Sequence, residues 1–486
     1  MTRLSFEPLT YDDIPADRRP SLGQALVPLL GMVVFLSIGA IVLGLDPHLP
    51  IVWGAVLTAA VGRYWLGISW EELFEGLVDG IRMGMQAILI LFIIYMLIAT
   101  WTSAGTIPGL IYYGLEILTP TVFLPATAAL ATVVAFSIGS SWTTAGTLGV
   151  AFMGIGAGLG VPAPMTAGAI LTGAYTGDKI SPLSDTTNLA AAVTNTDLME
   201  HVRTMRVGTG LAFGISLVCY AALGLSATGD IPAGRIETIQ SAIGGSYAIS
   251  PLVFVPLLVT FALALYGFPA LPSLLSGVFA GVGTTIAVQG VGFTAAWDIA
   301  QNGTDPATGS ELVNGLLGSS GLMGSTWTIT IVVAALALGG LLERTGVIAT
   351  IAHHIAGFVN SVTSLTLGTG VAAISMNVLA AEQYMSIVVP GMTLRGLYDD
   401  FDLESRNLSR AVEASGTVTS ALIPWNAGGA YMWSVLGVHP FEYAPYYFLG
   451  FLAPSILAIM AVTGWQITTK DDAPAATKGR GSPADD

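Results

Sequence analysis

The sequence is poor in charge, and most of its charge is of one sign. Only 10% of the 486 residues are charged, and 31 aspartates and glutamates outnumber 16 lysines and arginines, whereas 53% of the residues are hydrophobic. A soluble domain carries about 25% charged residues, so this composition excludes an ordinary globular protein. The lack of a basic patch gives no indication of nucleic-acid binding.

Cysteine and the familiar cofactor motifs are lacking as well. The single Cys219 excludes an intrachain disulfide and a thiolate metal cluster. No nucleotide loop, catalytic triad or histidine-rich metal motif occurs in the chain, so we expect neither an enzyme nor a bound cofactor. Residues 1–20 are acidic and polar without an early apolar core, so no signal peptide is expected.

Charged residues are missing from whole stretches rather than thinly distributed. The stretches without Asp, Glu, Lys or Arg are 22–45, 83–115, 117–177, 207–229, 238–297, 312–342, 414–441 and 443–469. Each exceeds the roughly 20 apolar residues that cross a bilayer as a helix. The sequence therefore predicts an all-α polytopic membrane protein with the lipid bilayer as its partner, and the net charge of −15 describes its water-facing parts.

We expect ten crossings, at 23–45, 50–66, 85–103, 164–195, 207–225, 250–268, 271–290, 325–343, 407–436 and 443–465. Ten crossings place both termini on one side, together with most of the arginines. The positive-inside rule makes that side cytoplasmic, which predicts a plasma-membrane protein with both termini in the cytoplasm. Two other apolar stretches, 121–160 and 363–392, each resemble two half-length helices around a polar middle and are predicted to be re-entrant hairpins.

The two halves of the chain are weakly similar to each other. A shift of 241 residues places Gly105 on Gly346, and a shift of 238 places Asn188 on Asn426. Each half holds three crossings and one hairpin, an odd number, so we expect the second copy to be inverted relative to the first. Inverted repeats are typical of secondary transporters, whose site lies between the repeats near the middle of the membrane.

These patterns divide the chain into six parts. We expect a cytoplasmic tail (1–20), two leading helices (21–69), a first transport repeat (70–225), a linker with two helices (226–320), a second transport repeat (321–466) and a disordered cytoplasmic tail (467–486). Each repeat would contain one re-entrant hairpin and one broken transmembrane helix.

A polar segment from Gly173 to Asn188, with the sequence GAYTGDKISPLSDTTN, interrupts the crossing at 164–195. Pro182 removes a backbone donor and Gly177 relaxes the backbone, so a helix cannot run through the segment undisturbed. The break offers hydroxyl, carboxylate and freed carbonyl oxygens, which are the hard ligands that sodium requires. We therefore expect a transport site here.

Two acids are the main candidates within this segment. Asp185, Thr186 and Asn188 are predicted to ligate sodium, because one short turn presents a charge and neutral oxygens. Asp178 is predicted to be the second coupling acid. Its alternative role is structural, as one member of a buried ion pair with Lys179 that holds the broken helix together. Supporting oxygens are expected from Ser181, Ser184 and Thr187. A carboxylate that binds either sodium or a proton is sufficient for exchange.

The second half contains a matching break with different chemistry. The segment TVTSALIPWNAGG, at 417–429, is interrupted at Pro424 and relaxed by Gly428. Asn426 corresponds to Asn188 of the first break and is a candidate supporting ligand. No carboxylate lies in this second break, so any acid of the second half must come from another element.

Glu382, in the second hairpin, supplies that acid. It is the only charged residue from 345 to 394, and an intramembrane acid is a functional candidate by default. The alternative role of Glu382 is structural: its carboxyl group would hold the hairpin tip through a hydrogen bond to Asn377 or Tyr384. Asn377 is itself a candidate ligand. Glu413, one turn after Arg410, is expected to be its i,i+3 partner rather than a ligand.

At 173–188 the sequence resembles the NhaC-type sodium/proton antiporter family. The segments DLMEH at 197–201, LSRAVE at 408–413 and IPWN at 423–426 are similar to that family too. The resemblance covers about 70–465 and implies an ion-transporter fold of two inverted repeats with paired hairpins, and sodium/proton exchange as the activity. Related members are described as also exchanging organic acids such as malate and lactate. Alanines at 191–192 replace a proline common in relatives, a departure that leaves the ion ligands untouched.

The expected function is secondary active export of sodium in exchange for protons by alternating access. Asp178, Asp185 and Glu382 would be the coupling acids, and sodium and protons the transported partners. The alternative is a sodium- and proton-coupled exchanger of small carboxylates or amino acids. The two differ in whether sodium/proton exchange proceeds without an organic substrate. The sequence does not decide between a monomer and a homodimer.

Overall fold

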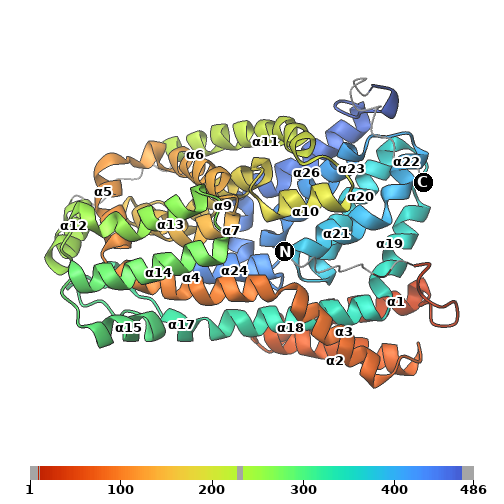
Figure 1. Ribbon diagram of the computed structural model, residues 1–486, viewed down its shortest axis with the longest axis horizontal. Helices are drawn as coiled ribbons and strands as arrows, with labels where there is room; N and C mark the ends of the chain where they lie inside the picture. Colours follow the sequence, from red (N-terminus) through yellow and green to blue (C-terminus); the bar gives the residue numbers. More distant parts are fainter. Residues whose placement is uncertain (1–8, 10, 227–233, 473–486) are drawn as a thin grey trace, which may run out of the picture.

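A computed structural model describes residue 9 and residues 11–226 and 234–472 (Figure 1). Within these residues the regular structure is helical, apart from two isolated bridges, Thr304–Ser319 and Leu403–Thr469. Residues 1–8, 10 and 473–486 of the two predicted tails, and residues 227–233 of the predicted linker, lie outside the described residues. The expectation of an all-α membrane protein is confirmed.

The first half of the chain follows two leading helices. The leading elements are α1 (Leu22–Ser37), which continues into the π-turn Ile38–Val42, and α2 (His48–Tyr64). The first half comprises α3 (Trp70–Met83), α4 (Met85–Ser103), α5 (Thr106–Ile117), α6 (Pro120–Ile138), α7 (Ser141–Thr144), the π-turn Ala145–Gly149, α8 (Val150–Gly158), α9 (Ala163–Ile180), α10 (Asp185–Val193) and α11 (Leu198–Ser226).

A helical linker joins the halves and consists of α12 (Arg235–Ser246), the 3-10 turn Pro251–Phe254, α13 (Val255–Leu265), α14 (Ala270–Ala287), α15 (Phe293–Asn302), α16 (Glu311–Leu317) and α17 (Gly321–Gly324). The second half comprises α18 (Thr326–Arg344), α19 (Val347–Gly357), α20 (Val362–Leu379), α21 (Gln383–Thr393), α22 (Arg395–Asp400), α23 (Ser405–Val412), the π-turn Glu413–Thr417, the 3-10 turn Ser420–Leu422, α24 (Ala427–Leu436), α25 (Pro440–Tyr443), the 3-10 turn Ala444–Tyr446 and α26 (Phe448–Thr463). A last 3-10 turn, Lys470–Asp472, ends the described chain.

Six helices of the described chain are long and apolar enough to cross a membrane, and two bent pairs raise this number to at most eight. Of the ten expected crossings, α4, α11, α14 and α18 are single long helices, whereas α12/α13 and α25/α26 bend by 90° and 60°. The hairpin arms α6 and α20 have 19 and 18 residues, so they are longer than the half-length helices expected. Their apolar runs continue without a break up to each polar tip.

Two glycines mark corresponding points of the two halves. Gly105 links α4 to α5 with a φ of +82°, and Gly346 links α18 to α19 with a φ of +72°. Glycine adopts this left-handed conformation without steric cost, which explains both residues. The helices that follow, α5 and α19, lie at opposite ends of the molecule in Figure 1, as an inverted relation between the halves requires.

Helix α9 packs closely along α6 through small residues. A Cβ atom on Gly173 would lie 2.2 Å from the carbonyl oxygen of Ala128, and one on Gly177 would lie 2.2 Å from that of Thr132. Glycines four residues apart let two membrane helices approach to backbone contact. The segment predicted to be a helix break therefore begins in a tightly fixed helix.

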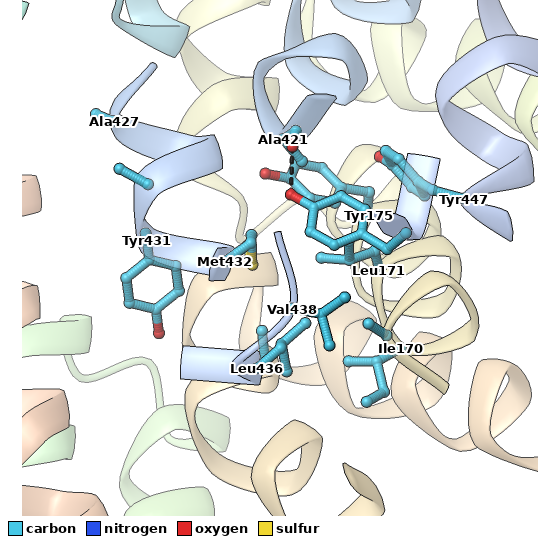
Figure 2. Packing of buried hydrophobic residues seen from close by; sticks show 14 of the residues in the cluster. Ile170, Leu171, Tyr175, Ala421, Ala427, Tyr431, Met432, Leu436, Val438 and Tyr447 are labelled. Carbon is cyan, nitrogen blue, oxygen red and sulfur yellow. Dashed lines mark hydrogen bonds between the residues drawn. The ribbon is translucent and has the colours of Figure 1, made fainter. Parts of the chain in front are cut away.

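The other side of α9 contacts the second half of the chain. Figure 2 shows Ile170, Leu171 and Tyr175 of α9 facing buried side chains of α24 that include Met432 and Leu436. Lipid is as apolar as these side chains, so close packing rather than exclusion from water stabilises such contacts inside a membrane. The first break is thus held between the two repeats.

Candidate functional site

A small cavity of about 20 Å³ lies where the tips of both hairpins meet the first helix break. Two acids of the first half and one of the second half line it, and these are the three acids predicted from the sequence. Its lining residues are Ala87, Ile90, Ser140, Ser141, Trp142, Asp178, Asp185, Glu382, Gln383 and Tyr384. We call this space the acid cavity. It lies between the repeats, where the sequence placed the transport site.

Each hairpin tip contacts the helix break of its own half. Gly139, with a φ of +73°, ends α6 so close to Leu183 that a Cβ atom would lie 2.5 Å from the Leu183 carbonyl carbon. In the second half, the carbonyl oxygen of Ala381 accepts a hydrogen bond from the N–H of Ala427 at 2.8 Å. Ala381 also has a positive φ, of 55°. The breaks and the tips therefore form one assembly in each repeat.

The first break occurs between α9 and α10. Helix α9 ends at Ile180, just before Pro182, and Ser184 caps the start of α10 by accepting a hydrogen bond from the N–H of Thr187. Ser181 ties the break to the first hairpin, because its hydroxyl donates to the carbonyl oxygen of Phe136 at 2.7 Å. A serine at the N-cap satisfies a backbone donor that would otherwise be unpaired.

Asp178 points from α9 towards the tip of the first hairpin and is buried. Its Oδ2 accepts hydrogen bonds from the Ser141 hydroxyl at 2.6 Å and from the Ser141 N–H at 3.2 Å, while Oδ1 has no partner in the described chain. The alternative ion pair with Lys179 does not form, because the two side chains diverge from consecutive positions of the helix. Lys179 is fully buried, and its Nζ has no hydrogen-bond partner among the described residues.

Asp185 lies at the start of α10 and is the exposed acid of the cavity. Its Oδ1 accepts a hydrogen bond from the Thr186 N–H at 2.8 Å, and its Oδ2 accepts one from the hydroxyl of Tyr384. Tyr384 belongs to the second hairpin, so this bond joins the two repeats directly across the cavity. No pattern in the sequence indicates this contact between residues of different halves.

Glu382 is buried at the tip of the second hairpin and caps α21. Its carboxylate accepts hydrogen bonds from the backbone N–H groups of Tyr384 at 2.5 Å and Met385 at 3.3 Å. This is the tip-holding arrangement that the sequence left open as the alternative for Glu382, except that the donors are backbone groups. Glu382 also lines the acid cavity.

The structure does not bring the three predicted sodium ligands together at the cavity. Asp185 lines the cavity, whereas the Thr186 hydroxyl donates to Glu413 Oε1 at 3.2 Å. The side-chain amide of Asn188 turns back to donate to the carbonyl oxygens of Ser184 and Pro182, at 2.6 and 3.0 Å. The Thr187 hydroxyl donates to the carbonyl oxygen of Asp178 at 3.3 Å. These polar groups stabilise the break from within.

The second break carries an asparagine pair. Asn377 of α20 donates to the carbonyl oxygen of Gly416 and to the Thr419 hydroxyl, at 2.5 and 2.9 Å. Asn426 donates to the backbone and side-chain oxygens of Asn377, at 3.0 and 3.2 Å, and its own Oδ1 caps α24 at Gly428. Both asparagines are buried and neither lines the acid cavity. Pro424 lies in the turn before α24, as predicted.

Glu413 is the acid that the sequence analysis missed. It was expected to pair with Arg410, but Arg410 donates instead to the carbonyl oxygen of Gln466 at 2.9 Å and to Asn407 at 3.3 Å. Glu413 is fully buried at the start of a π-turn, with one oxygen on the Thr186 hydroxyl and the other without a partner in the described chain. Glu413 keeps regular α-helical angles after α23, and the expected pair with Arg410 does not form because each side chain finds other partners.

The electrostatics of the acid cavity favour a cation. Among the described residues, no lysine, arginine or histidine forms an ion pair with Asp178, Asp185, Glu382 or Glu413. No three of the described histidine, cysteine, aspartate and glutamate residues lie close enough to hold one metal ion between them. A carboxylate in a poorly solvated site requires a cation or a proton as its partner.

Comparisons with known proteins identify antiporters as relatives of this chain. The Na+/H+ antiporter family matches residues 24–187 and 173–465. The arginine/ornithine antiporter ArcD of Halobacterium salinarum is 54% identical over 471 residues, which cover 96% of this chain and 97% of that protein. The Na+/H+ antiporter NhaC of Alkalihalophilus pseudofirmus is 36% identical, over 92% and 97% of the two chains.

A third relative is named for substrates that differ from those of the first two. The malate-2H+/Na+-lactate antiporter of Bacillus subtilis is 34% identical, over 91% of this chain and 93% of that protein. The relatives thus share antiport and differ in what they exchange. The NhaC-type resemblance seen at 173–188 is confirmed, and the chain belongs to the Na+/H+ antiporter family.

Proposed function

We propose that the protein is an antiporter of cations whose main cargo is a basic amino acid of the arginine and ornithine type. The observation that carries this proposal is the acid cavity, in which three carboxylates face one space without a cation from the protein. An anion such as malate would be repelled by these carboxylates, whereas a guanidinium or ammonium group would neutralise them. The 54% identity to an arginine/ornithine antiporter over nearly the whole chain supports the amino acid as cargo.

The cavity lining suits a guanidinium group in particular. Trp142 and Tyr384 line the same space as the acids, and Trp142 stacks on Tyr431 with ring centroids 4.4 Å apart. Arginine side chains bind carboxylates through two parallel hydrogen bonds and stack on aromatic faces. A bare sodium ion would make no use of the aromatic rings. In this conformation the cavity has room for about one water-sized group, so an amino acid would enter only when alternating access of the two repeats opens the cavity to one side of the membrane or the other.

Counterflow in proteoliposomes tests this cargo. Vesicles loaded with unlabelled ornithine are diluted into labelled arginine, and uptake is compared with that of unloaded vesicles. We expect rapid uptake only into loaded vesicles, at equal sodium and pH on both sides. The same uptake rate in loaded and unloaded vesicles would contradict the proposal.

Variants of the cavity acids test whether counterflow depends on the acid cavity. Asp178→Asn and Asp185→Asn should each lower counterflow at least about tenfold, since each removes an ionic contact worth 1.4 kcal/mol or more. Asp298→Asn is the matched control, because Asp298 is an exposed acid of α15 far along the chain from the cavity residues. An equal loss of counterflow in Asp298→Asn would show that the loss does not depend on the acid cavity.

Sodium/proton exchange is the second candidate. It is favoured by the family match and by the NhaC relative. It requires only that one carboxylate of the cavity bind sodium and a proton alternately. Vesicles that carry a pH gradient and a pH-sensitive dye separate the two candidates: dissipation of the gradient on addition of sodium, without any amino acid, supports sodium/proton exchange. Dissipation that requires arginine or ornithine supports the first candidate.

A further inference from the structure

A larger cavity, of about 340 Å³, is lined by residues of α4, α8 and α24, and the exposed Gly318 and Ser320 lie at its rim. We call this space the outer cavity. Arg235 of α12 donates a hydrogen bond at 2.9 Å to the carbonyl oxygen of Ala157, which lines the outer cavity. The outer cavity therefore lies at the α12 end of the molecule. The positive-inside rule predicts that this end, opposite α22 in Figure 1, is extracellular.

We propose that the outer cavity is the route by which cargo reaches the acid cavity from the extracellular side, and that Trp142 and Tyr431 close this route in the present conformation. The proposal rests on the proposed function in taking the acid cavity as the cargo site. The outer cavity has room for an amino acid, whereas the acid cavity has room for about one water-sized group. Cargo from outside would therefore fill the outer cavity first.

The two cavities follow one another along two elements of the first half. In α4, Ile90 lines the acid cavity and Tyr95 lines the outer cavity, and five residues of helix span about 8 Å. In the first hairpin, Trp142 lines the acid cavity and Val150, at the start of α8, lines the outer cavity. A short layer of side chains is therefore all that separates the two spaces.

Trp142 and Tyr431 form that layer. Their rings stack with centroids 4.4 Å apart, and the Tyr431 hydroxyl donates to the carbonyl oxygen of Trp142 at 2.6 Å. Gly146 leaves no space beside them, because a Cβ atom there would lie 2.4 Å from the Tyr431 hydroxyl oxygen and 2.8 Å from Cδ1 of Ile94. Ile94 lies in α4 between the residues that line the two cavities. The first hairpin, α4 and α24 thus close on one another through these four residues.

The walls of the outer cavity suit the passage of a cation. None of the described residues that line it is charged, so no fixed charge would hold the cargo there. Helix α8 ends at Gly158 and α24 ends at Leu436, and both last turns line the cavity. The C-terminus of a helix carries a partial negative charge, which favours a guanidinium or ammonium group over an anion.

Cysteine accessibility tests the route without any cargo. In a Cys219→Ala background, Ser434→Cys places a thiol in the outer cavity, and Ala87→Cys places one in the acid cavity. Intact cells are treated with a membrane-impermeant methanethiosulfonate that carries a quaternary ammonium group. We expect Ser434→Cys to react at least about tenfold faster than Ala87→Cys, and Ser216→Cys, at a fully buried position of α11, to remain unreactive. An unreactive Ser434→Cys, or equal rates at Ser434→Cys and Ala87→Cys, would overturn the proposal.

A variant of Tyr431 tests the closing layer. Tyr431→Phe keeps the ring and removes the hydrogen bond to Trp142, so Ala87→Cys should react about fivefold faster or more while Ser434→Cys keeps its rate. Tyr447→Phe is the matched control, because it removes a similar bond, to the Val418 carbonyl oxygen at 3.1 Å, and lines neither cavity. General loosening of the fold would also expose Ser216→Cys.

An unchanged rate at Ala87→Cys in Tyr431→Phe, or an equal rise in Tyr447→Phe, would refute the closing role of Tyr431. Because the labelling uses no amino acid, its outcome does not depend on arginine counterflow. Failure of the outer route and failure of the proposed cargo can therefore be told apart.

Discussion

Individual side chains in the first break have separate tasks although they are close in sequence. Asp178 faces the hairpin tip and the acid cavity, whereas Lys179 is buried on another face of α9 beside Glu413. Asp185, seven residues after Asp178, reaches the second repeat through Tyr384. One buried acid and one exposed acid of the same break therefore line the acid cavity, whereas Lys179 does not.

Lys179 and Glu413 should show energetic coupling. Glu413→Gln removes a carboxylate whose charge acts on the buried ammonium group of Lys179 without forming an ion pair with it, and we expect it to destabilise the protein by about 1–3 kcal/mol. Lys179→Met alone should destabilise it too, because Glu413 is then a buried charge without a cation. The double variant removes both charges and should be more stable than the sum of the single effects predicts, by about 1 kcal/mol or more. Denaturant unfolding of the four proteins gives the coupling, and strict additivity would contradict it.

The hydroxyl of Tyr384 should matter for cargo binding more than for stability. Tyr384→Phe keeps the ring and removes the donor that orients the Asp185 carboxylate. A hydrogen bond to a charged group contributes about 1.5–3 kcal/mol, so we expect the KM for cargo to rise roughly tenfold or more. The melting temperature should change little, since Asp185 is exposed. Tyr113→Phe, at an exposed tyrosine of α5, is the control, and an unchanged KM in Tyr384→Phe would refute the role.

At the scale of helices, the transport site depends on how closely α9 approaches α6. The glycines at 173 and 177 bring the two backbones into contact, and the hairpin tip then meets the break at Leu183. Ser181 adds a hydrogen bond between the same two elements. The position of Asp178 is therefore set by backbone contacts several residues earlier in the helix.

Gly173→Ala should be strongly destabilising for this reason. The added methyl would lie 2.2 Å from the Ala128 carbonyl oxygen, and separating the helices to admit it costs about 1–3 kcal/mol. Gly214→Ala is the matched control on α11, where an added Cβ meets no atom within 4 Å. Alanine is the better helix former, so the control should be neutral or stabilising. Thermal unfolding in detergent measures both, and equal midpoints would contradict the packing argument.

At the scale of the whole molecule, the repeats place equivalent helices at opposite ends. Figure 1 shows α12 at one end and α19 and α22 at the other. The positive-inside rule predicts that the end with α19 and α22 is cytoplasmic. The acid cavity lies between these ends, with elements of both halves around it.

Cysteine labelling tests this orientation. In a Cys219→Ala background, Glu237→Cys should react with a membrane-impermeant maleimide added to intact cells, because Glu237 is exposed on α12. Lys470→Cys should react only after the cells are opened, since it lies beyond α26 on the predicted cytoplasmic side. The reverse pattern would show that the chain is inserted the other way round.

The sequence by itself determined the class of protein, the two breaks and three of the acids. Long runs without charge can only be buried in lipid, and proline within such a run must interrupt a helix, so Pro182 and Pro424 were identified without a structure. Acids within these runs are too costly to be incidental, which identified Asp178, Asp185 and Glu382. These inferences use only local composition and chain order.

The tertiary structure decided which groups meet. The Tyr384–Asp185 contact joins residues 199 positions apart, and no periodicity predicts it. Glu413 accepts a hydrogen bond from Thr186 of the other half, and Arg410 donates to Gln466, so the pairing that helical spacing suggested does not form. Asn188 was predicted to ligate sodium because of its neighbours in sequence. Its side-chain amide instead donates to the carbonyl oxygen of Ser184 within the same break. Side-chain partners across two repeats depend on how helices pack and rotate, and that is fixed by contacts distant in sequence.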